Sequence, residues 1–259
     1  MATAKKKKDV KPAVRARSGK TASGASIGSH DTAVYIRRCE EYDREKIRGL
    51  VLEGMREGLR YVGSFPPLRN YLGAIALVSF FAFPYMVLLP VFAREILGGG
   101  PSTLGFLMGA TGLGALAGSI RLALRKSPVG LGKIMAVSCV LLGLSMTAFS
   151  LSRIFALSLV LMACLGFFMV STLVSCNTLV QTLVDEDKRN RVMSLFIVSA
   201  MGITPLGSLN AGWIASRLGA PFTLMAGGII SVVIGLLLLK AWPSMWTLSE
   251  PVYRKKNLL

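Results

Sequence analysis

Long apolar runs without a single charged residue fill most of the chain from residue 70 onward. They cover residues 70–93, 96–120, 134–151, 154–184, 192–216 and 221–239. A helix that crosses the hydrocarbon layer of a membrane needs about 20 residues, each adding ~1.5 Å. The runs therefore predict six transmembrane helices joined by short loops. They do not alternate in polarity from residue to residue, which argues against membrane-spanning strands.

A different pattern precedes the first run. Between residues 43 and 62 apolar residues recur near the helical period, with Arg, Glu and Lys between them. This pattern predicts an amphipathic helix that ends near Pro66 and Pro67 and leads into the first span. Residues 1–33 hold almost no large apolar side chains and are expected to be disordered.

The predicted organisation has four parts. These are a basic tail at 1–33, an amphipathic linker helix at 34–69, a membrane domain at 70–241 and a C-terminal tail at 242–259. For the basic tail two roles stay open. It is either a plain solvated extension or a segment held to an anionic membrane surface by its lysines and arginines.

Composition agrees with a membrane protein. The chain is 53% hydrophobic and 17% charged, whereas a soluble domain is typically ~25% charged. Its net charge of +17 comes from 30 Lys and Arg against 13 Asp and Glu, and these residues lie outside the apolar runs. A water-soluble enzyme is excluded, as is a domain that binds nucleic acid through a basic face. The expected surroundings are a lipid bilayer.

The positions of the basic residues predict the orientation. Basic clusters lie before the first run and after the second, fourth and sixth, whereas the three intervening loops hold only Arg94, Arg153 and Arg217. Cytosolic segments carry the excess of Lys and Arg. Both termini are therefore expected in the cytosol, with the protein in the plasma membrane.

Acidic residues are absent from all six runs, so neutral polar residues are the candidates for a substrate path. They are Tyr85, Ser171, Ser175, Asn177, Gln181, Thr204 and Asn210. The alternative for each is a hydrogen bond between helices. The chain has one histidine, His30, and no acid–base pair or ligand cluster in the membrane. We therefore expect no enzymatic activity, no cofactor and no metal site.

Glycines in the second and fifth runs predict close helix packing. Two GxxxG pairs, Gly105 with Gly109 and Gly114 with Gly118, lie in the second run. The fifth run contains Gly207 and Gly212 near Pro205. Such spacing lets two helix backbones approach each other in lipid. The similar character of the two runs fits an inverted repeat of three spans plus three.

Four stretches resemble a known family. They are EGMREGLRYVGSFPPLRNYL at 53–72, LLPVFAREILGGGPSTLGFLMGATGLGALAGS at 88–119, NTLVQTLVDEDKRNRVMSLF at 177–196 and PLGSLNAGWIASRLGA at 205–220. Together they resemble the C-terminal half of a major facilitator superfamily transporter, in the bacterial branch of the enterobactin exporter and macrolide-efflux proteins. The resemblance implies an all-α six-helix bundle in the bacterial inner membrane.

The resemblance also implies a gating turn after the fourth span. Gln181, Arg189 and Arg191 match the family's pattern, whereas Asp185 replaces its usual proline and Asn190 its usual glycine. By resemblance, Arg189 and Arg191 would pair with Glu186 or Asp187 to close the cytosolic side. In the loop after the second span Arg121 and Arg125 remain, without the family's aspartate. The alternative is that both are ordinary basic loops.

Transporters of this superfamily hold substrate between two six-span halves. The sequence therefore predicts half of an exporter of a small amphiphilic molecule, such as a siderophore or drug. It would work by alternating access with a second half or a second copy of itself. The alternative is a remnant without transport activity, or a regulatory or structural membrane subunit.

Overall fold

A computed structural model describes residues 56–125 and 127–256. The predicted basic tail and most of the predicted linker helix lie outside the described residues. A helical segment at 56–64 precedes the bundle. The elements that follow are α2 (Pro66–Phe81), α3 (Tyr85–Val91), the π-helix η1 (Phe92–Ile96), α4 (Pro101–Ala123), α5 (Leu131–Leu151), α6 (Phe155–Leu183), the 3₁₀-helix η2 (Glu186–Lys188), α7 (Arg189–Ile197), the π-helix η3 (Val198–Gly202), α8 (Thr204–Leu218) and α9 (Ala220–Lys255).

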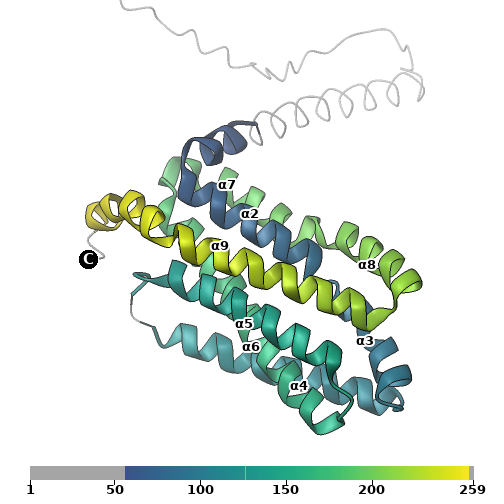
Figure 1. The fold of residues 1–259 in the computed structure, drawn as a ribbon. Helices are drawn as coiled ribbons and strands as arrows, with labels where there is room; N and C mark the ends of the chain where they lie inside the picture. The colour runs from purple at the N-terminus through teal and green to yellow at the C-terminus, as the bar shows by residue number, and fades with distance from the viewer. Residues whose placement is uncertain (1–55, 126, 257–259) are drawn as a thin grey trace, which may run out of the picture. The chain divides into compact units, whose positions relative to one another are not determined.

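The prediction of six membrane-spanning helices is confirmed for the described part of the chain, which contains no strand (Figure 1). Some spans consist of several elements, and their bounds are Pro66–Ile96, Pro101–Ala123, Leu131–Leu151, Phe155–Leu183, Glu186–Leu218 and Ala220–Lys255. The last span continues well beyond residue 241, where the sequence places the start of a tail. Its extra turns form an amphipathic extension of the same helix, with Met245, Ser249 and Tyr253 buried on one side.

Prolines interrupt the first and fifth spans. The first span breaks at Pro84, between α2 and α3, and becomes a π-helix after Pro90. In the fifth span a π-helix ends immediately before α8, whose second residue is Pro205. Proline has no N–H group to donate to the carbonyl four residues back, so the helix widens or breaks nearby. Interruptions of this kind in membrane helices often lie at functional sites.

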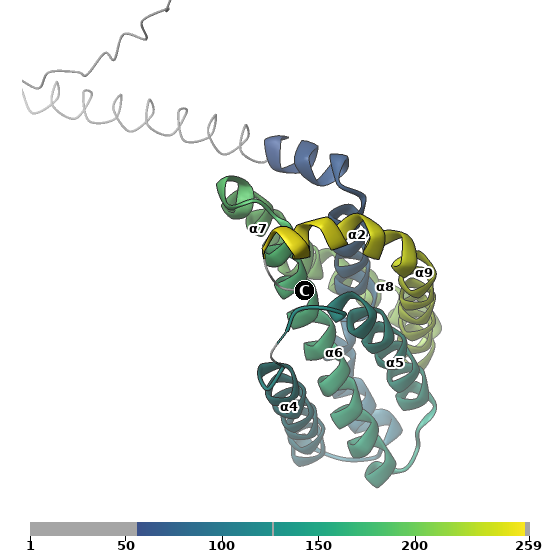
Figure 2. The same cartoon turned by 90° about the vertical axis from the view of Figure 1, so that its left-hand side faces the viewer.

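Glycines bring the helices into contact. Along the bundle, α4 packs on α6, α6 on α5, and α5 on α9, while α2 and α8 pack on the other side of α9 (Figure 2). A Cβ atom at Gly114 or Gly118 of α4 would collide with backbone carbonyls of α6. Gly143 of α5 lies in the same way against Gly228 of α9, and Gly207 of α8 against Phe80 of α2. In lipid such close packing is a main source of helix association.

One end of the bundle gathers most of the basic residues that the structure describes, and we call it the basic end. It contains the turn between α4 and α5, the turn between α6 and α7, the helical segment 56–64 and the end of α9. Lys256 ties two of these parts together, because its Nζ donates hydrogen bonds to the carbonyls of Thr182 at 2.7 Å and Val184 at 3.2 Å. The opposite end has sharper turns, and Gly219 between α8 and α9 has a φ of +86° that favours glycine.

The glycine contacts predict a difference between two alanine variants of α4. Gly114→Ala places a methyl group against the Ala163 carbonyl, whereas a Cβ at Gly109 has nothing within 4 Å. Both variants gain the same helix propensity, so their difference isolates packing. We expect Gly114→Ala to be less stable than Gly109→Ala by about 1–3 kcal/mol. Thermal unfolding of the purified chain measures it, and equal melting temperatures would contradict the packing described here.

Candidate substrate path and gating turn

A cavity of about 410 Å³ lies where the interrupted spans meet. It is formed by the α2–α3 junction, α6 and the region around η3 and α8, and it contains no charged residue. Its lining residues are Phe83, Leu173, Ala200, Met201, Thr204, Pro205 and Ser208. Of the predicted substrate-path residues, the structure places Thr204 here. An apolar wall with two hydroxyl groups suits an amphiphilic molecule better than a small ion.

Side chains supply hydrogen-bond donors to the irregular backbone beside this cavity. The carbonyl of Ala200 in η3 accepts a hydrogen bond of 3.0 Å from the Ser79 hydroxyl of α2 and one of 3.3 Å from the Thr204 hydroxyl. A carbonyl without a partner would be costly inside a membrane. Ser79 is fully buried, and this bond connects the first span to the fifth at the point where the fifth is interrupted. Sequence reasoning missed Ser79 and Met201, which belong to no motif, and it did not propose a path role for Ser208, although Ser208 lies in the family-like stretch 205–220.

The polar residues of α6 are divided among different surroundings. Ser171 is fully buried against α4, and its hydroxyl donates to the Phe167 carbonyl of its own helix at 2.7 Å. Asn177 and Gln181 bond to each other at 2.9 Å near the basic end. These residues are therefore not brought together in one path with Thr204.

Ser175 has a different environment. It is fully buried, and its hydroxyl has no hydrogen-bond partner among the described residues. It lines a second cavity, of about 500 Å³, between the ends of α4 and α6 and the start of α5. Thr178, Thr182 and Ser119 line the same cavity and make its wall rich in hydroxyl groups.

Two predicted path residues lie apart from these cavities. Tyr85 begins α3 and is buried, and its hydroxyl has no partner within the described chain. Asn210 lies on α8 and is half-buried. Neither residue lines the cavity around Thr204 or the one around Ser175.

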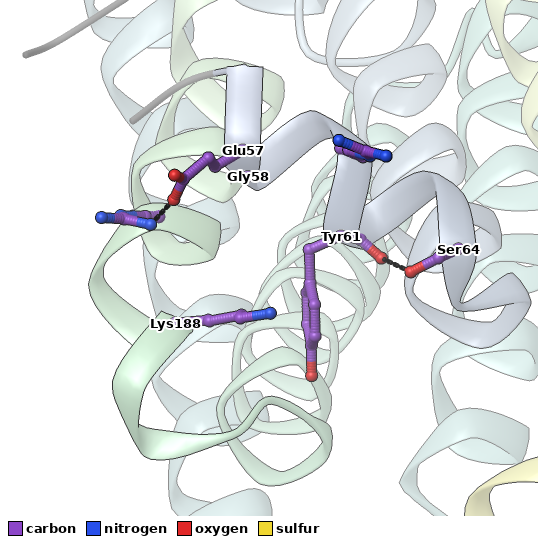
Figure 3. Close-up of a pocket in the computed structure, with 7 residues that line it drawn as sticks. Glu57, Gly58, Tyr61, Ser64 and Lys188 are labelled. Carbon is purple, nitrogen blue, oxygen red and sulfur yellow. Dashed lines mark hydrogen bonds and ion pairs between the residues drawn. The ribbon is translucent and has the colours of Figure 1, made fainter. Parts of the chain in front are cut away.

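The turn between α6 and α7 makes its contacts mainly with the segment before the first span. Arg191 forms an ion pair with Glu57, whose side chain is labelled in Figure 3. Asp185 accepts a 3.1 Å hydrogen bond from the Tyr61 hydroxyl. The Lys188 ammonium lies 4.8 Å from the centre of the Tyr61 ring, as a cation–π contact. Burial raises the pKa of the Tyr61 phenol above its ordinary value, which already keeps it neutral and a hydrogen-bond donor at pH 7. We call these contacts the linker latch.

Within the turn itself, the predicted gating residues interact weakly. Arg189 and Glu186 approach to 4.0 Å in an ion pair whose glutamate is largely exposed. Asp187 is exposed as well. Exposed ion pairs of this kind contribute about 0–1 kcal/mol. The turn has further contacts with Glu57 and Tyr61, which lie more than 100 residues away, and no motif in the turn predicts them.

In the turn between α4 and α5, Arg125 acts on the backbone. Its Nε donates to the Ser127 carbonyl at 2.8 Å, and its guanidinium also bonds the Val129 carbonyl. Arg121 lies with its guanidinium carbon 5.8 Å from the centre of the Phe167 ring. Arg121 and Arg125 thus face different groups from those of the linker latch.

The predicted packing glycines fall into two groups. Gly114, Gly118 and Gly207 lie against backbone of neighbouring helices. A Cβ at Gly105, Gly109 or Gly212 would meet nothing within 4 Å. The described residues contain no group of three or more His, Cys, Asp and Glu that could hold a metal ion.

An all-helical bundle with six spans, two of them interrupted at a neutral cavity, is the architecture of a multi-pass membrane transporter domain. A family model described as transmembrane secretion effector (MFS_3) matches residues 32–249. The chain therefore belongs to this family of the major facilitator superfamily, and the resemblance noted in the sequence is confirmed.

The chain is also similar in sequence to a curated efflux pump. The chain is 29% identical over 197 residues to a protein described as multidrug efflux pump Tap from Mycolicibacterium fortuitum. The match covers 75% of this chain and 47% of that protein, so the chain spans about half the length of the relative it matches. No solved structure matches the chain.

The linker latch predicts a charge-swap result. Glu57→Arg or Arg191→Glu alone places like charges together, so the helical segment 56–64 should separate from the turn. The double swap restores the attraction. Spin labels at Ser64 and Ser194, in a background without native cysteines, report the distance. We expect a narrow distribution in the parent chain, broad ones in both single variants and a narrow one in the double swap. Identical distributions in the parent chain and both single variants would contradict a role for this ion pair.

Proposed function

We propose that this chain is the substrate-binding half of an exporter that moves a small amphiphilic molecule out of the cell by alternating access. The observation that carries the proposal is the neutral cavity at the interrupted first and fifth spans. Membership of the transmembrane secretion effector family and similarity to a multidrug efflux pump support the same activity. A siderophore or a drug is the expected class of substrate.

We propose further that the basic end faces the cytosol of a bacterial cell, with the protein in the inner membrane. The excess of Lys and Arg at this end supports the orientation. In this orientation the linker latch and the hydroxyl-rich cavity around Ser175 lie on the side from which substrate enters.

A second six-helix bundle is the proposed working partner. Only four of the 23 residues of α4 are buried, and α8 buries only Gly207 and Ala211. The uncovered sides carry large apolar residues, including Leu113 and Leu209, which are more than two-thirds exposed. Lipid or a second bundle would cover these sides. The second bundle would come from another chain, a second copy or another segment of the same polypeptide.

The transport proposal is tested with two matched variants of α8. Ser208→Phe fills the cavity, whereas Ser216→Phe adds the same ring at an exposed position outside it. The chain is expressed alone and as a covalent tandem in bacteria that lack their main drug exporters, and retention of a fluorescent amphiphilic dye is measured. We expect the parent and Ser216→Phe to lower retention and Ser208→Phe to lose most of this effect. Unchanged dye retention in both the single-chain and tandem forms would refute an exporter built from this chain alone or from two copies of it.

A further inference from the structure

A groove of about 540 Å³ opens on the outside of the bundle at its basic end, away from the proposed substrate cavity. Its walls come from the last turn of α4, the first half of α5, the middle of α6 and Trp242 of α9. The rim of the groove that lies toward the basic end carries Arg121, Arg125 and Lys133. The inner wall is apolar and includes Val137, Leu141, Phe167 and Phe168.

The rim has a positive charge that nothing within the groove neutralises. No acidic residue lines the groove. The ion pairs of the described chain lie elsewhere, at Glu57, Glu186 and Glu250. The Arg125 guanidinium donates to backbone carbonyls, which hold it in place but leave its charge uncancelled. Arg121 and Lys133 are exposed.

The position along the bundle matches the boundary between lipid tails and headgroups. Helices α4 and α6 run parallel, with Gly114 beside Ala163, so the end of α4 is roughly level with Thr172 and α6 projects further. About 20 residues of α6 or α9 cross the hydrocarbon layer. This length brings α6 to about Val174 and α9 to about Leu239, close to the basic rim and to Trp242. Tryptophan is enriched at this boundary.

We propose that the groove binds an anionic phospholipid. Its phosphate lies between Arg121 and Lys133, and an acyl chain runs down the apolar wall past Val137 and Phe168. Basic pockets between transmembrane helices at a membrane surface have the chemistry that recognises anionic headgroups. A free phosphate would leave the apolar wall uncovered, and a cationic amphiphile would be repelled by the rim. The lipid would join the α4–α5 turn to α9.

Trp242 provides the measurement, because it lines the groove. With Trp213 and Trp246 replaced by phenylalanine, Trp242 is the remaining tryptophan. The full chain is placed in vesicles that contain phosphatidylglycerol or phosphatidylcholine with brominated acyl chains, which quench fluorescence on contact. We expect brominated phosphatidylglycerol to quench Trp242 at a several-fold lower mole fraction than brominated phosphatidylcholine.

Two pairs of variants separate the headgroup contact from the chain contact. Each cation beside an anionic lipid strengthens binding about fivefold, so Arg121→Gln with Lys133→Gln should weaken phosphatidylglycerol association about 30-fold and remove the preference. The matched control, Arg94→Gln with Arg153→Gln, changes charge equally at the opposite end and should keep the preference. Val137→Phe narrows the groove and should weaken association several-fold, whereas Val160→Phe, on an exposed part of α6 outside the groove, should not.

The comparison of the two lipids in the parent chain decides the proposal even if a variant fails to fold. Equal quenching by the two lipids would overturn it, since the groove would then be an unselective lipid contact. Displacement of the brominated lipid by soluble glycerophosphoglycerol would also overturn it, because the site would then bind a free anion. Neither quenching result depends on transport. Failure of the lipid proposal and failure of the exporter proposal, which is tested by dye retention, can therefore be distinguished.

Discussion

Close contact between backbones at glycine positions holds the six spans together. Lipid tails are as apolar as the side chains, so burial of leucine and valine alone supplies little attraction between helices in a membrane. Gly114 against α6, Gly143 against α9 and Gly207 against α2 supply it instead, because the missing Cβ lets carbonyl groups approach. The order of helices across the bundle follows from which glycine faces which neighbour.

The interruptions of the first and fifth spans depend on this packing. A widened helix turn leaves carbonyl groups without their usual partners, and a membrane offers no water to bond them. The contact of α8 with α2 at Gly207 holds the first and fifth spans close together, where the Ser79 hydroxyl reaches the Ala200 carbonyl. The result is a neutral cavity between packed helices, beside an interrupted backbone whose Ala200 carbonyl accepts two side-chain hydrogen bonds.

Charge at the basic end has more than one use. Some cations are paired across long stretches of chain, as Arg191 is with Glu57, and Tyr61 bonds Asp185 across 124 residues. Lys256 closes the end of α9 onto the carbonyls at the end of α6. Arg121 and Lys133 have no acidic partner in the described chain and border an apolar groove. The basic residues at this end thus have three roles. Some form the linker latch, Lys256 bonds backbone carbonyls, and Arg121 and Lys133 leave an unpaired positive charge along the groove.

Hydropathy and charge along the chain are local quantities, and they were enough to predict the number of spans and their connection by short loops. The family was predicted separately, from the resemblance of four stretches of sequence. Thr204 and Ser175 were among the neutral polar residues proposed for a substrate path, since no acidic residue lies in any of the apolar runs. The sequence pattern did not separate Gly114 from Gly109, because both belong to the same spacing motif and only the position of α6 distinguishes them. Glu57 and Ser79 carried no local signal, since each acquires its role from a group more than 100 residues away. Contacts between distant segments depend on how helices rotate and cross, and that geometry exists only once the bundle has packed.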